Sequence, residues 1–357
     1  MFGLFKKDKT PQAPRHISIQ PLGETLEHKN GDTILTTALE AGINFPHNCR
    51  VGGCATCKCK LVEGEVQELT DKSYLLSAEE MANNYILGCQ SVPKGDVVVE
   101  VDGLEAGASS ISMVKTSATI SSVRNLTHDI IELNLSLADG MDYVAGQYAD
   151  IELPAELGEG TRSYSFAQSP QLRRGDKQLS FHVRKVPNGE FTEWLHASDR
   201  SGAALNLSGP YGDFHLRPGN APILAVAGGS GMAPLKALLE HAREEGVTRD
   251  VVYLFGARTQ ADLYCLEEME ALTKGWLAHF QFVPVLNQED EGSNWAGRRG
   301  LVTDHIQELV GGRLSEQHVY MCGPPPMIDA AEAVLKDAGV DGSNIHYDKF
   351  LDSSHTA

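Results

Sequence analysis

Hydrophobic and polar positions follow three different rhythms along the chain, and each rhythm predicts a different kind of domain. The first part has short alternating segments, typical of strands, together with two segments of helical period. Strands are expected at 16–28 (two, around a turn), 58–62, 65–68 and 97–101, and helices at 33–39 and 77–83. Asp32 is the expected N-cap of the first helix, and Gly42 its end. These segments predict a small α+β domain.

From about residue 114 the alternation becomes regular, with turn residues between successive segments. Strands are expected at 117–123, 130–135, 149–153, 163–167 and 179–186. Consecutive alternating strands joined by turns predict an antiparallel β-barrel.

Beyond Pro222, apolar runs alternate with amphipathic segments of helical period. Strands are expected at 223–227, 250–255, 280–285 and 318–321, and helices at 232–243, 261–273, near 303–309 and at 325–338. This alternation predicts a parallel, doubly wound α/β domain. The expected boundaries are a tail at 1–15, the α+β domain at 16–106, the barrel at 112–217 and the α/β domain at 218–357, with a flexible linker at 107–110.

Composition narrows the function further. A chain of 357 residues with 41% hydrophobic residues is expected to form two or three domains. Its net charge of −18 argues against nucleic acid as a partner, because that requires a basic surface. Neither a signal peptide nor an apolar run of the roughly 18 residues that span a bilayer is visible. Seven cysteines fit a reducing compartment, so a cytoplasmic location is expected.

The cysteines themselves carry the clearest motif. Cys49, Cys54 and Cys57 have the spacing C-x4-C-x2-C, and Cys89 follows at a distance. This is the plant-type ligand pattern of a [2Fe–2S] cluster, to which thiolates are suited as soft ligands. A structural zinc site typically has two C-x2-C pairs, and a Rieske centre needs two histidines. Cys59 is a rival to Cys57 as ligand, but the spacing favours Cys57 and makes Cys59 a strand residue.

A glycine-rich turn, Gly228-Gly229-Ser230-Gly231, joins the first strand of the α/β domain to its helix. Its glycines would let a phosphate approach the backbone, and the helix N-terminus would favour the negative charge. The spacing is not G-x-G-x-x-G, however, and such turns often serve only close packing. Both interpretations stay open.

Two other segments carry candidate binding groups. Arg162-Ser163-Tyr164-Ser165 offers a cation for a diphosphate, an aromatic ring for stacking and a hydroxyl for a ring nitrogen. Cys322-Gly323-Pro324 follows a strand at its carboxyl end, where open α/β sheets bind ligands. The alternatives are a half-exposed strand of mixed residues for the first segment and a proline-stiffened loop with a buried cysteine for the second.

Taken together, longer segments make the chain resemble one family from roughly residue 16 to 351. These segments are FPHNCRVGGCATCKCKL, RSYSF, FHVRKVPNGEFTEWL, AGGSGMAPLK, FGARTQADLYCLEEME, MCGPPPMIDAAE and HYDKF. They resemble the NADH-dependent reductase components of bacterial aromatic-ring monooxygenases and dioxygenases, within the ferredoxin–NADP reductase superfamily. The resemblance implies a plant-type [2Fe–2S] ferredoxin domain, an FAD-binding barrel and an NADH-binding α/β domain, in this order.

The resemblance also implies roles for single residues. Arg162 would bind the FAD diphosphate, Tyr164 would stack on the isoalloxazine, and Ser165 would hydrogen-bond near N5. A short helix begun by Gly189, Phe191 and Thr192 would hold the diphosphate, and the FAD site would be completed by Ser163, His182, Val183 and Arg184. The NADH diphosphate would be lined by Gly228, Gly229, Ser230 and Gly231. Cys322 and Gly323 would lie beside the nicotinamide, and Phe350 would cover the flavin until the nicotinamide displaces it. The implied catalytic set is Ser165, Cys322, Tyr164 and Phe350.

The implied activity is electron transfer from NADH to FAD, then to [2Fe–2S], and then to a terminal oxygenase or hydroxylase component, soluble or membrane-bound. An alternative acceptor is the dehydrase of deoxysugar synthesis, which reductases of the same architecture serve. NADH is favoured over NADPH because Arg258 is followed by the acidic Asp262, Glu267 and Glu268.

Two basic segments suggest where a partner would bind. The tail at 1–15 combines Phe and Leu with Lys, so it is either a solvated end or a weak element that docks on a partner or on the inner membrane surface. Arg50, Lys58 and Lys60 surround the cysteine loop. They either compensate the charge of the cluster or dock an acidic partner surface.

Overall fold

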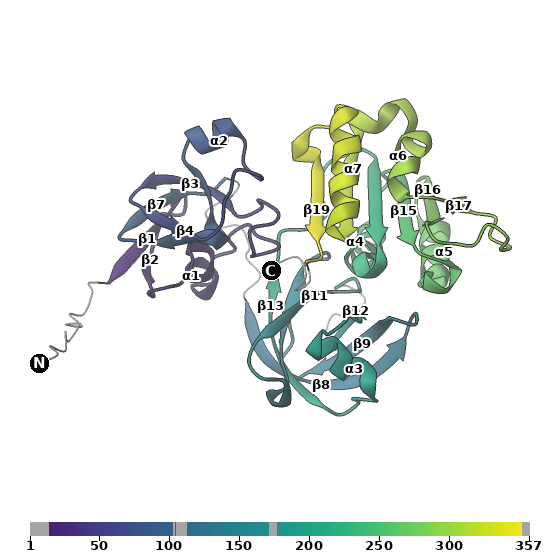
Figure 1. The fold of residues 1–357 in the computed structure, drawn as a ribbon, viewed down its shortest axis with the longest axis horizontal. Coiled ribbons are helices and arrows are strands. Elements are labelled where there is room, and N and C mark those ends of the chain that lie inside the picture. Colours follow the sequence, from purple (N-terminus) through teal and green to yellow (C-terminus); the bar gives the residue numbers. More distant parts are fainter. Residues whose placement is uncertain (1–13, 103, 105–112, 171–176, 352–357) are drawn as a thin grey trace, which may run out of the picture. The chain divides into compact units, whose positions relative to one another are not determined.

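Three large sheets organise the described residues, 14–102, 104, 113–170 and 177–351, of a computed structural model (Figure 1). The chain divides into two compact units, one formed by Met1–Pro46 and Arg50–Ser110 and the other by His47–Cys49 and Ile111–Ala357. Residues 1–13 of the expected tail and the linker at 107–110 lie outside the described residues. Each unit is considered by itself below.

The first unit is built on a five-stranded sheet with the order β2-β1-β7-β3-β5. Its elements are β1 (Arg15–Gln20), β2 (Glu24–His28), α1 (Ile34–Glu40), β3 (Lys58–Glu63), β4 (Val66–Glu68), α2 (Ala78–Ala82), β5 (Tyr85–Leu87), the 3-10 turn η1 (Gly88–Gln90), β6 (Ser91–Pro93) and β7 (Val97–Glu100). Ile17 and Ile19 of β1 and Ile34 of α1 are fully buried in its interior. The expected strands and helices are confirmed here, and the three-residue strands β5 and β6 are additions.

One expected helix cap is wrong. The N-cap of α1 is Thr33, not Asp32, because the Thr33 hydroxyl accepts the backbone N–H of Thr36 at 3.1 Å. The carbonyl of Asp32 is instead hydrogen-bonded to the ring of His28 at 2.8 Å. Either residue type can cap a helix, so only the backbone path decides between neighbours.

The barrel of the second unit is a six-stranded antiparallel sheet with the order β11-β10-β13-β8-β9-β12. Its elements are β8 (Val114–Asn125), β9 (Ile130–Leu137), β10 (Tyr148–Glu152), the 3-10 turn η2 (Ala155–Leu157), β11 (Thr161–Ser165), β12 (Gln178–Arg184), α3 (Glu190–Ala197) and β13 (Ala204–Tyr211). A bridge between Phe166 and Phe181 joins the two edges, and both rings are fully buried. The expected strands are confirmed, and β13 is an addition whose burial alternates like theirs.

The α/β part is a six-stranded parallel sheet with the order β17-β16-β15-β14-β18-β19. Its elements are β14 (Ile223–Gly228), η3 (Gly229–Gly231), α4 (Met232–Glu244), β15 (Val251–Ala257), η4 (Gln260–Asp262), α5 (Leu266–Gly275), β16 (Phe280–Leu286), β17 (Arg298–Arg299), α6 (Val302–Val310), η5 (Gly311–Glu316), β18 (His318–Gly323), α7 (Pro325–Asp337), η6 (Gly342–Asn344) and β19 (Ile345–Lys349).

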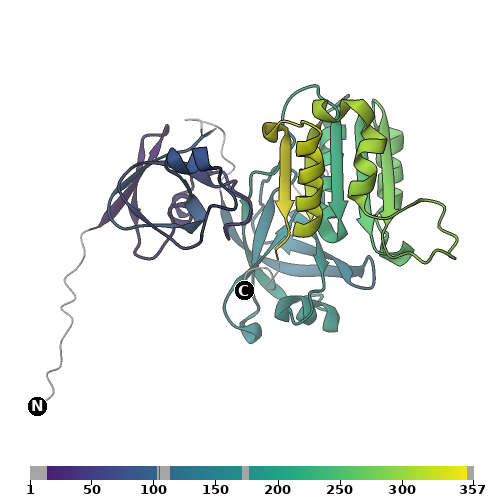
Figure 2. The ribbon, with the colours of Figure 1, turned by 45° about the horizontal axis from the view of Figure 1, so that its top comes forward.

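Helices cover both faces of this sheet (Figures 1 and 2). Ala225 and Ala227 of β14 pack toward α4 and α5, whereas Leu224 and Val226 pack toward α6 and α7. Both faces of β14 are therefore apolar, which explains its continuous hydrophobic run. The order of the strands reverses between β14 and β18, and an open sheet binds ligands outside the carboxyl ends at such a point.

The helix expected at 261–273 starts later than predicted. Thr259 and Asp262 bracket a 3-10 turn, Cys265 has a left-handed φ of 55°, and α5 begins at Leu266. The left-handed residue interrupts the helical backbone, which a hydrophobic period cannot reveal.

Buried polar contacts fix the barrel against the α/β part within the second unit. Lys236 of α4 pairs with Glu240 at 2.7 Å and donates to the carbonyl of Ala167 in the barrel at 3.1 Å. The Ser169 hydroxyl donates to Glu244 at 2.7 Å. These bonds hold the barrel close to the carboxyl ends of β14 and β18. None of the helices in the described ranges is long and apolar enough to cross a membrane.

Candidate functional site

The first unit gathers Cys54, Cys57 and Cys89, all buried. The Cys57 thiol donates to the sulfur of Cys89, and this bond, with hydrogen bonds from Gln90 and the Gly52 backbone, lowers the pKa of Cys89 against the effect of burial. Neighbouring soft ligands with backbone and amide donors aimed at sulfur are what a [2Fe–2S] cluster requires. The residues present therefore fit such a cluster, with Cys49, at the start of the same loop, as the ligand expected from the spacing.

The loop reaches this arrangement through left-handed backbone at Arg50, Gly52 and Ala55. At Gly52 a glycine is required, since an added Cβ would lie 2.8 Å from Cγ of Gln90. Cys59 lies in β3, fully buried, and burial raises the pKa of its thiol to about 12. The pKa of the Cys57 thiol is likewise raised, by its hydrogen bond to Cys89 and by burial, so the preference for Cys57 over Cys59 rests on the spacing.

In the barrel, β11 places the Arg162–Ser165 segment along one edge of the sheet. The Tyr164 ring packs against Phe191 at 5.9 Å, and burial raises its pKa. Ser163 points the other way and donates to Asp150 at 2.7 Å, whereas Ser165 is buried. Arg162 is exposed, and its guanidinium donates to the carbonyl of Thr161 at 2.8 Å.

The turn before α3 is held by Thr192. Its hydroxyl accepts the N–H of Val186 at 3.0 Å and donates to the carbonyl of Gly189 at 3.0 Å. Gly189 has no room for a side chain, because an added Cβ would lie 2.7 Å from that hydroxyl. The first N–H groups of α3 carry no side-chain cap, so they can bind an anion. Phe191 is fully buried and belongs to the barrel core.

The three remaining expected FAD residues lie on β12 and differ in exposure. Val183 is fully buried in the core, and Arg184 is exposed and pairs with Asp129 at 3.4 Å. His182 is buried against Tyr264, and its Nδ1 has no hydrogen-bond partner among the described residues. An unpaired polar atom beside the expected flavin site is a group that a bound ligand could satisfy.

His182 makes stability depend on pH. Burial, with the charge of Lys236, lowers its pKa from 6.5 to about 3. As the pH falls, His182 is therefore protonated in the unfolded chain before it is protonated in the folded protein. Its contribution to the free energy of unfolding is complete above pH 6.5 and is lost as the pH falls toward 3. Between pH 7 and 5 we expect this residue to lower the free energy of unfolding by about 2 kcal/mol. Urea unfolding of the wild type and of His182→Asn at both pH values measures the difference, and equal pH dependence would contradict it.

A cavity of about 270 Å³ lies at the carboxyl ends of β14, β15, β16 and β18. Gly228 and Gly229 line it, together with Arg258, Asp262 and, from the barrel, Asp129. Gly229 has a left-handed φ of 56° and open space where a side chain would be. The cavity thus offers bare backbone at a helix N-terminus, which fits the diphosphate of a dinucleotide.

Gly231 has a different role, because it does not line this cavity. An added Cβ would lie 2.1 Å from the carbonyl oxygen of Cys322. Gly231 therefore lets α4 approach the end of β18, the packing alternative raised from the sequence. Ser230, half-buried, lies between the two kinds of glycine.

Cys322 and Gly323 end β18, where Cys322 is fully buried and burial raises its pKa. The backbone N–H of Phe350 donates to the carbonyl of Gly323 at 2.9 Å. Phe350 is half-buried against the core that contains Cys322. The structure therefore brings Phe350 close to Cys322 and Gly323, which lie well before it in the sequence.

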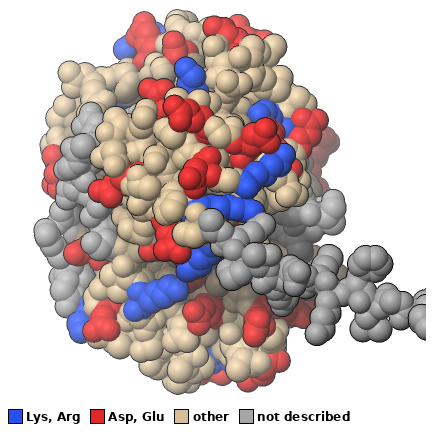
Figure 3. Space-filling view, turned by 90° about the vertical axis from the view of Figure 1, so that its left-hand side faces the viewer, with Lys and Arg blue, Asp and Glu red and all other residues tan. Residues whose placement is uncertain are grey.

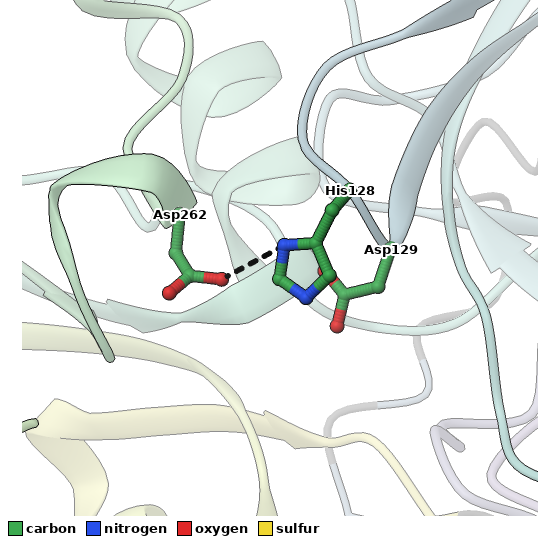
Figure 4. A group of neighbouring side chains, drawn as sticks. All are labelled: His128, Asp129 and Asp262. Atoms are coloured by element: carbon green, nitrogen blue, oxygen red, sulfur yellow. Dashed lines mark ion pairs between the residues drawn. The ribbon is translucent and has the colours of Figure 1, made fainter.

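The cavity wall also holds a cluster of charged side chains. The sequence analysis had named two of its members, Arg258 and Asp262. His128, Asp129 and Asp262 turn toward one another in Figure 4, from the barrel and the α/β part. They could hold a metal ion by composition, but the Arg258 guanidinium lies among them, 2.9 Å from Asp129 and 2.6 Å from Asp262. Arg258 is thus their cation. Asp129 follows a strand of another domain, and no motif marks it.

The basic residues around the cysteine loop do not stand alone. Lys58 pairs with Glu80 at 2.5 Å. Figure 3 shows blue and red side chains interspersed on one face, without a large patch of one sign. Lys58 is thus neutralised within the first unit, which argues against its part in a basic docking patch and leaves compensation of the cluster charge as a prediction.

Comparisons with known proteins agree with the three-part architecture. Residues 17–94 match the 2Fe-2S iron-sulfur cluster binding domain family, 117–216 the oxidoreductase FAD-binding domain family and 225–333 the oxidoreductase NAD-binding domain family. The xylene/toluene monooxygenase electron transfer component XylA of Pseudomonas putida is 44% identical over 98% of this chain and 96% of its own.

Two more proteins extend the comparison. The phenol 2-monooxygenase reductase component DmpP of Pseudomonas sp. strain CF600 is 35% identical over 96% of this chain and 95% of its own. Among solved structures, the Amycolatopsis cytochrome P450 reductase GcoB is 32% identical, with a TM-score of 0.80 over 95% of this chain and 99% of its own. The expected ferredoxin, flavin-barrel and nucleotide domains are thereby confirmed as a fold.

Proposed function

The chain belongs to the reductase components of bacterial oxygenase systems, and on this basis we propose that it passes electrons from NADH through FAD and a [2Fe–2S] cluster to a terminal oxygenase. The observation that carries the proposal is that each of the three matched domains has a site suited to its cofactor. The first unit has the gathered cysteines, the barrel has the Tyr164 edge with the uncapped start of α3, and the α/β part has the glycine-lined cavity.

The chemistry explains why one chain holds these sites. NADH yields two electrons as a hydride and a [2Fe–2S] cluster takes one at a time, so FAD, which can do both, supplies the exchange between them. The chain contributes binding and orientation. Gly228 and Gly229 receive the coenzyme diphosphate, while Cys322 and Gly323 border the nicotinamide position. Ser165 and Tyr164 would orient the flavin ring, and Phe350 would cover its other face.

The FAD diphosphate would be bound by Arg162 together with the free N–H groups at the start of α3. Thr192 acts mainly by holding that turn in shape, since its hydroxyl already bonds Val186 and Gly189. At the edge of the FAD site, Arg184 would contribute a positive charge, and Ser163 would support β11 through its hydrogen bond to Asp150. The four cluster ligands would be Cys49, Cys54, Cys57 and Cys89.

The acceptor is proposed to be the oxygenase component of a system that acts on aromatic or other hydrocarbons, soluble or membrane-bound. The names of the relatives support this, since they are reductase or electron transfer components of xylene/toluene and phenol monooxygenases. They do not favour the dehydrase of deoxysugar synthesis. A cytoplasmic location, with any membrane contact made through the partner, belongs to the same proposal.

Anaerobic titration of the purified protein with NADH tests the route. We expect the flavin absorbance to bleach and a rhombic low-temperature EPR signal of a reduced [2Fe–2S] centre to appear. If the flavin bleached while the cluster stayed oxidised and EPR-silent, electrons would not take this path and the ferredoxin part would need another role.

A further inference from the structure

Arg258, on the wall of the coenzyme cavity, is held between carboxylates of two domains. Its Nη2 lies 2.6 Å from Asp262, four residues along the α/β part, and 2.9 Å from Asp129 of the barrel. Nη2 is also 3.4 Å from the ring of His128. One nitrogen of the guanidinium is therefore shared by two anionic groups. Figure 4 shows these two carboxylates together with His128.

Both carboxylates are fixed and largely shielded from water. The side chain of Asp129 is 15% exposed, and it also accepts from the Thr127 hydroxyl at 3.0 Å. Asp262 is 10% exposed and accepts the N–H and hydroxyl of Thr259, each at 2.9 Å. Burial opposes their charge, but the hydrogen bonds from Thr127 and Thr259, with Arg258, lower the pKa of both. Both carboxylates are therefore ionised at neutral pH.

Arg258 lies where a side chain could contact the ribose of the coenzyme. NADH and NADPH differ only in the 2′-phosphate. In doubly wound domains an acidic residue that follows the glycine turn binds the 2′-hydroxyl, whereas a nearby Arg accommodates a 2′-phosphate. Arg258 follows β15, the neighbour of β14, and lines the same cavity as Gly228 and Gly229. By residue type alone it would serve NADPH.

We propose that Asp129, a residue of the flavin barrel, determines coenzyme specificity by holding the Arg258 guanidinium away from a 2′-phosphate. This deepens the proposed function and rests on it, because it concerns the same coenzyme site. With Asp129 in place, a 2′-phosphate would have to displace a half-buried carboxylate from Arg258 and then lie beside it. Without that carboxylate, Asp262 alone pairs with Arg258, and the side of the guanidinium that faced Asp129 becomes available for the charge-assisted hydrogen bonds that Arg forms with phosphate.

The first test is Asp129→Asn in the holoprotein, since Asn keeps the shape and removes the charge. Calorimetry with 2′,5′-ADP and with 5′-AMP measures the effect of the 2′-phosphate without turnover. We expect the affinity for 2′,5′-ADP to rise about tenfold and that for 5′-AMP to change less than about twofold. The ratio of kcat/KM for NADPH to that for NADH should rise by a similar factor. An unchanged ratio of the two affinities would overturn the proposal.

A second variant tests the same idea even if Asp129→Asn folds poorly. Arg258→Gln in the wild-type background should leave the ratio of the 2′,5′-ADP affinity to the 5′-AMP affinity within about twofold, because Nη2 of Arg258 is already paired with both carboxylates. A clear fall in that ratio would mean that Arg258 binds the 2′-phosphate in the native protein, which contradicts the proposal. In the double variant Asp129→Asn/Arg258→Gln, the gain of the single variant should disappear.

Glu308→Gln is the matched control. It removes a carboxylate from the exposed bidentate pair with Arg298, at 2.7 and 2.8 Å, in the same part of the chain. The ratio of 2′,5′-ADP affinity to 5′-AMP affinity should be the same in this variant as in the wild type. A rise in this ratio like that of Asp129→Asn would mean that any loss of negative charge has the effect, which would overturn the proposal. If NADH failed to reduce the wild-type flavin, the proposed function would fall, whereas the nucleotide affinities would still decide the role of Asp129.

Discussion

Replacing Cys89 by serine is expected to abolish one-electron delivery and leave flavin reduction intact. Cys89 accepts hydrogen bonds from the Cys57 thiol and the Gly52 backbone N–H, so its replacement removes a proposed cluster ligand together with these bonds. Loss of a group that only supports a metal ligand typically lowers metal affinity or activity about 10–100-fold. Loss of a ligand itself should therefore lower the rate of NADH–cytochrome c reduction by at least about 100-fold. NADH–ferricyanide reduction, which the flavin can carry out directly, should stay within about twofold of the wild type.

Cys59→Ala provides the matched control, because Cys59 is buried two positions beyond Cys57 on β3. It should keep the [2Fe–2S] absorbance and EPR signal, with at most a small loss of stability from the missing sulfur. If Cys59→Ala lost the cluster while Cys89→Ser kept it, the ligand assignment would be wrong.

Gly231→Ala is expected to have the largest effect on stability and coenzyme binding for the addition of a single methyl group. The new Cβ would lie 2.1 Å from the oxygen and 2.5 Å from the carbon of the Cys322 carbonyl, both backbone atoms that cannot rotate away. Such overpacking should cost about 3 kcal/mol of unfolding free energy. It also pushes α4 away from β18 at the point where Gly228, Gly229 and Cys322 meet, so NADH affinity should fall about tenfold or more.

Gly229→Ala separates this clash from the loss of a glycine. Gly229 has a φ of 56°, but no atom lies within 4 Å of an added Cβ. We expect a cost of only about 1–2 kcal/mol from the left-handed backbone. Urea denaturation and NADH titration of both variants measure the two effects. A Gly231→Ala protein as stable as Gly229→Ala would show that the two segments do not pack as described.

Much of the architecture could be predicted because the period of hydrophobic residues reflects local geometry. Five of the six strands of the barrel, all but β13, and the alternation of strands and helices after residue 222 were predicted correctly, since each follows from which side chains face a core. Boundaries were less accurate at Thr33 and at Leu266, where a hydroxyl cap and a left-handed residue decide the backbone path. The three-residue strands β5 and β6 are too short for any period to appear.

The amino-acid sequence alone was enough to predict candidate sites that each lie within one short segment: the C-x4-C-x2-C pattern, the Arg162–Ser165 segment and the glycine turn. Only the tertiary structure decided which glycine faces the cavity and which packs against Cys322, because this depends on a carbonyl of a strand that is distant in sequence. It likewise revealed Asp129 beside Arg258. A charged pair between two domains leaves no periodic signal, since its members are brought together by folding and not by neighbouring positions in the chain.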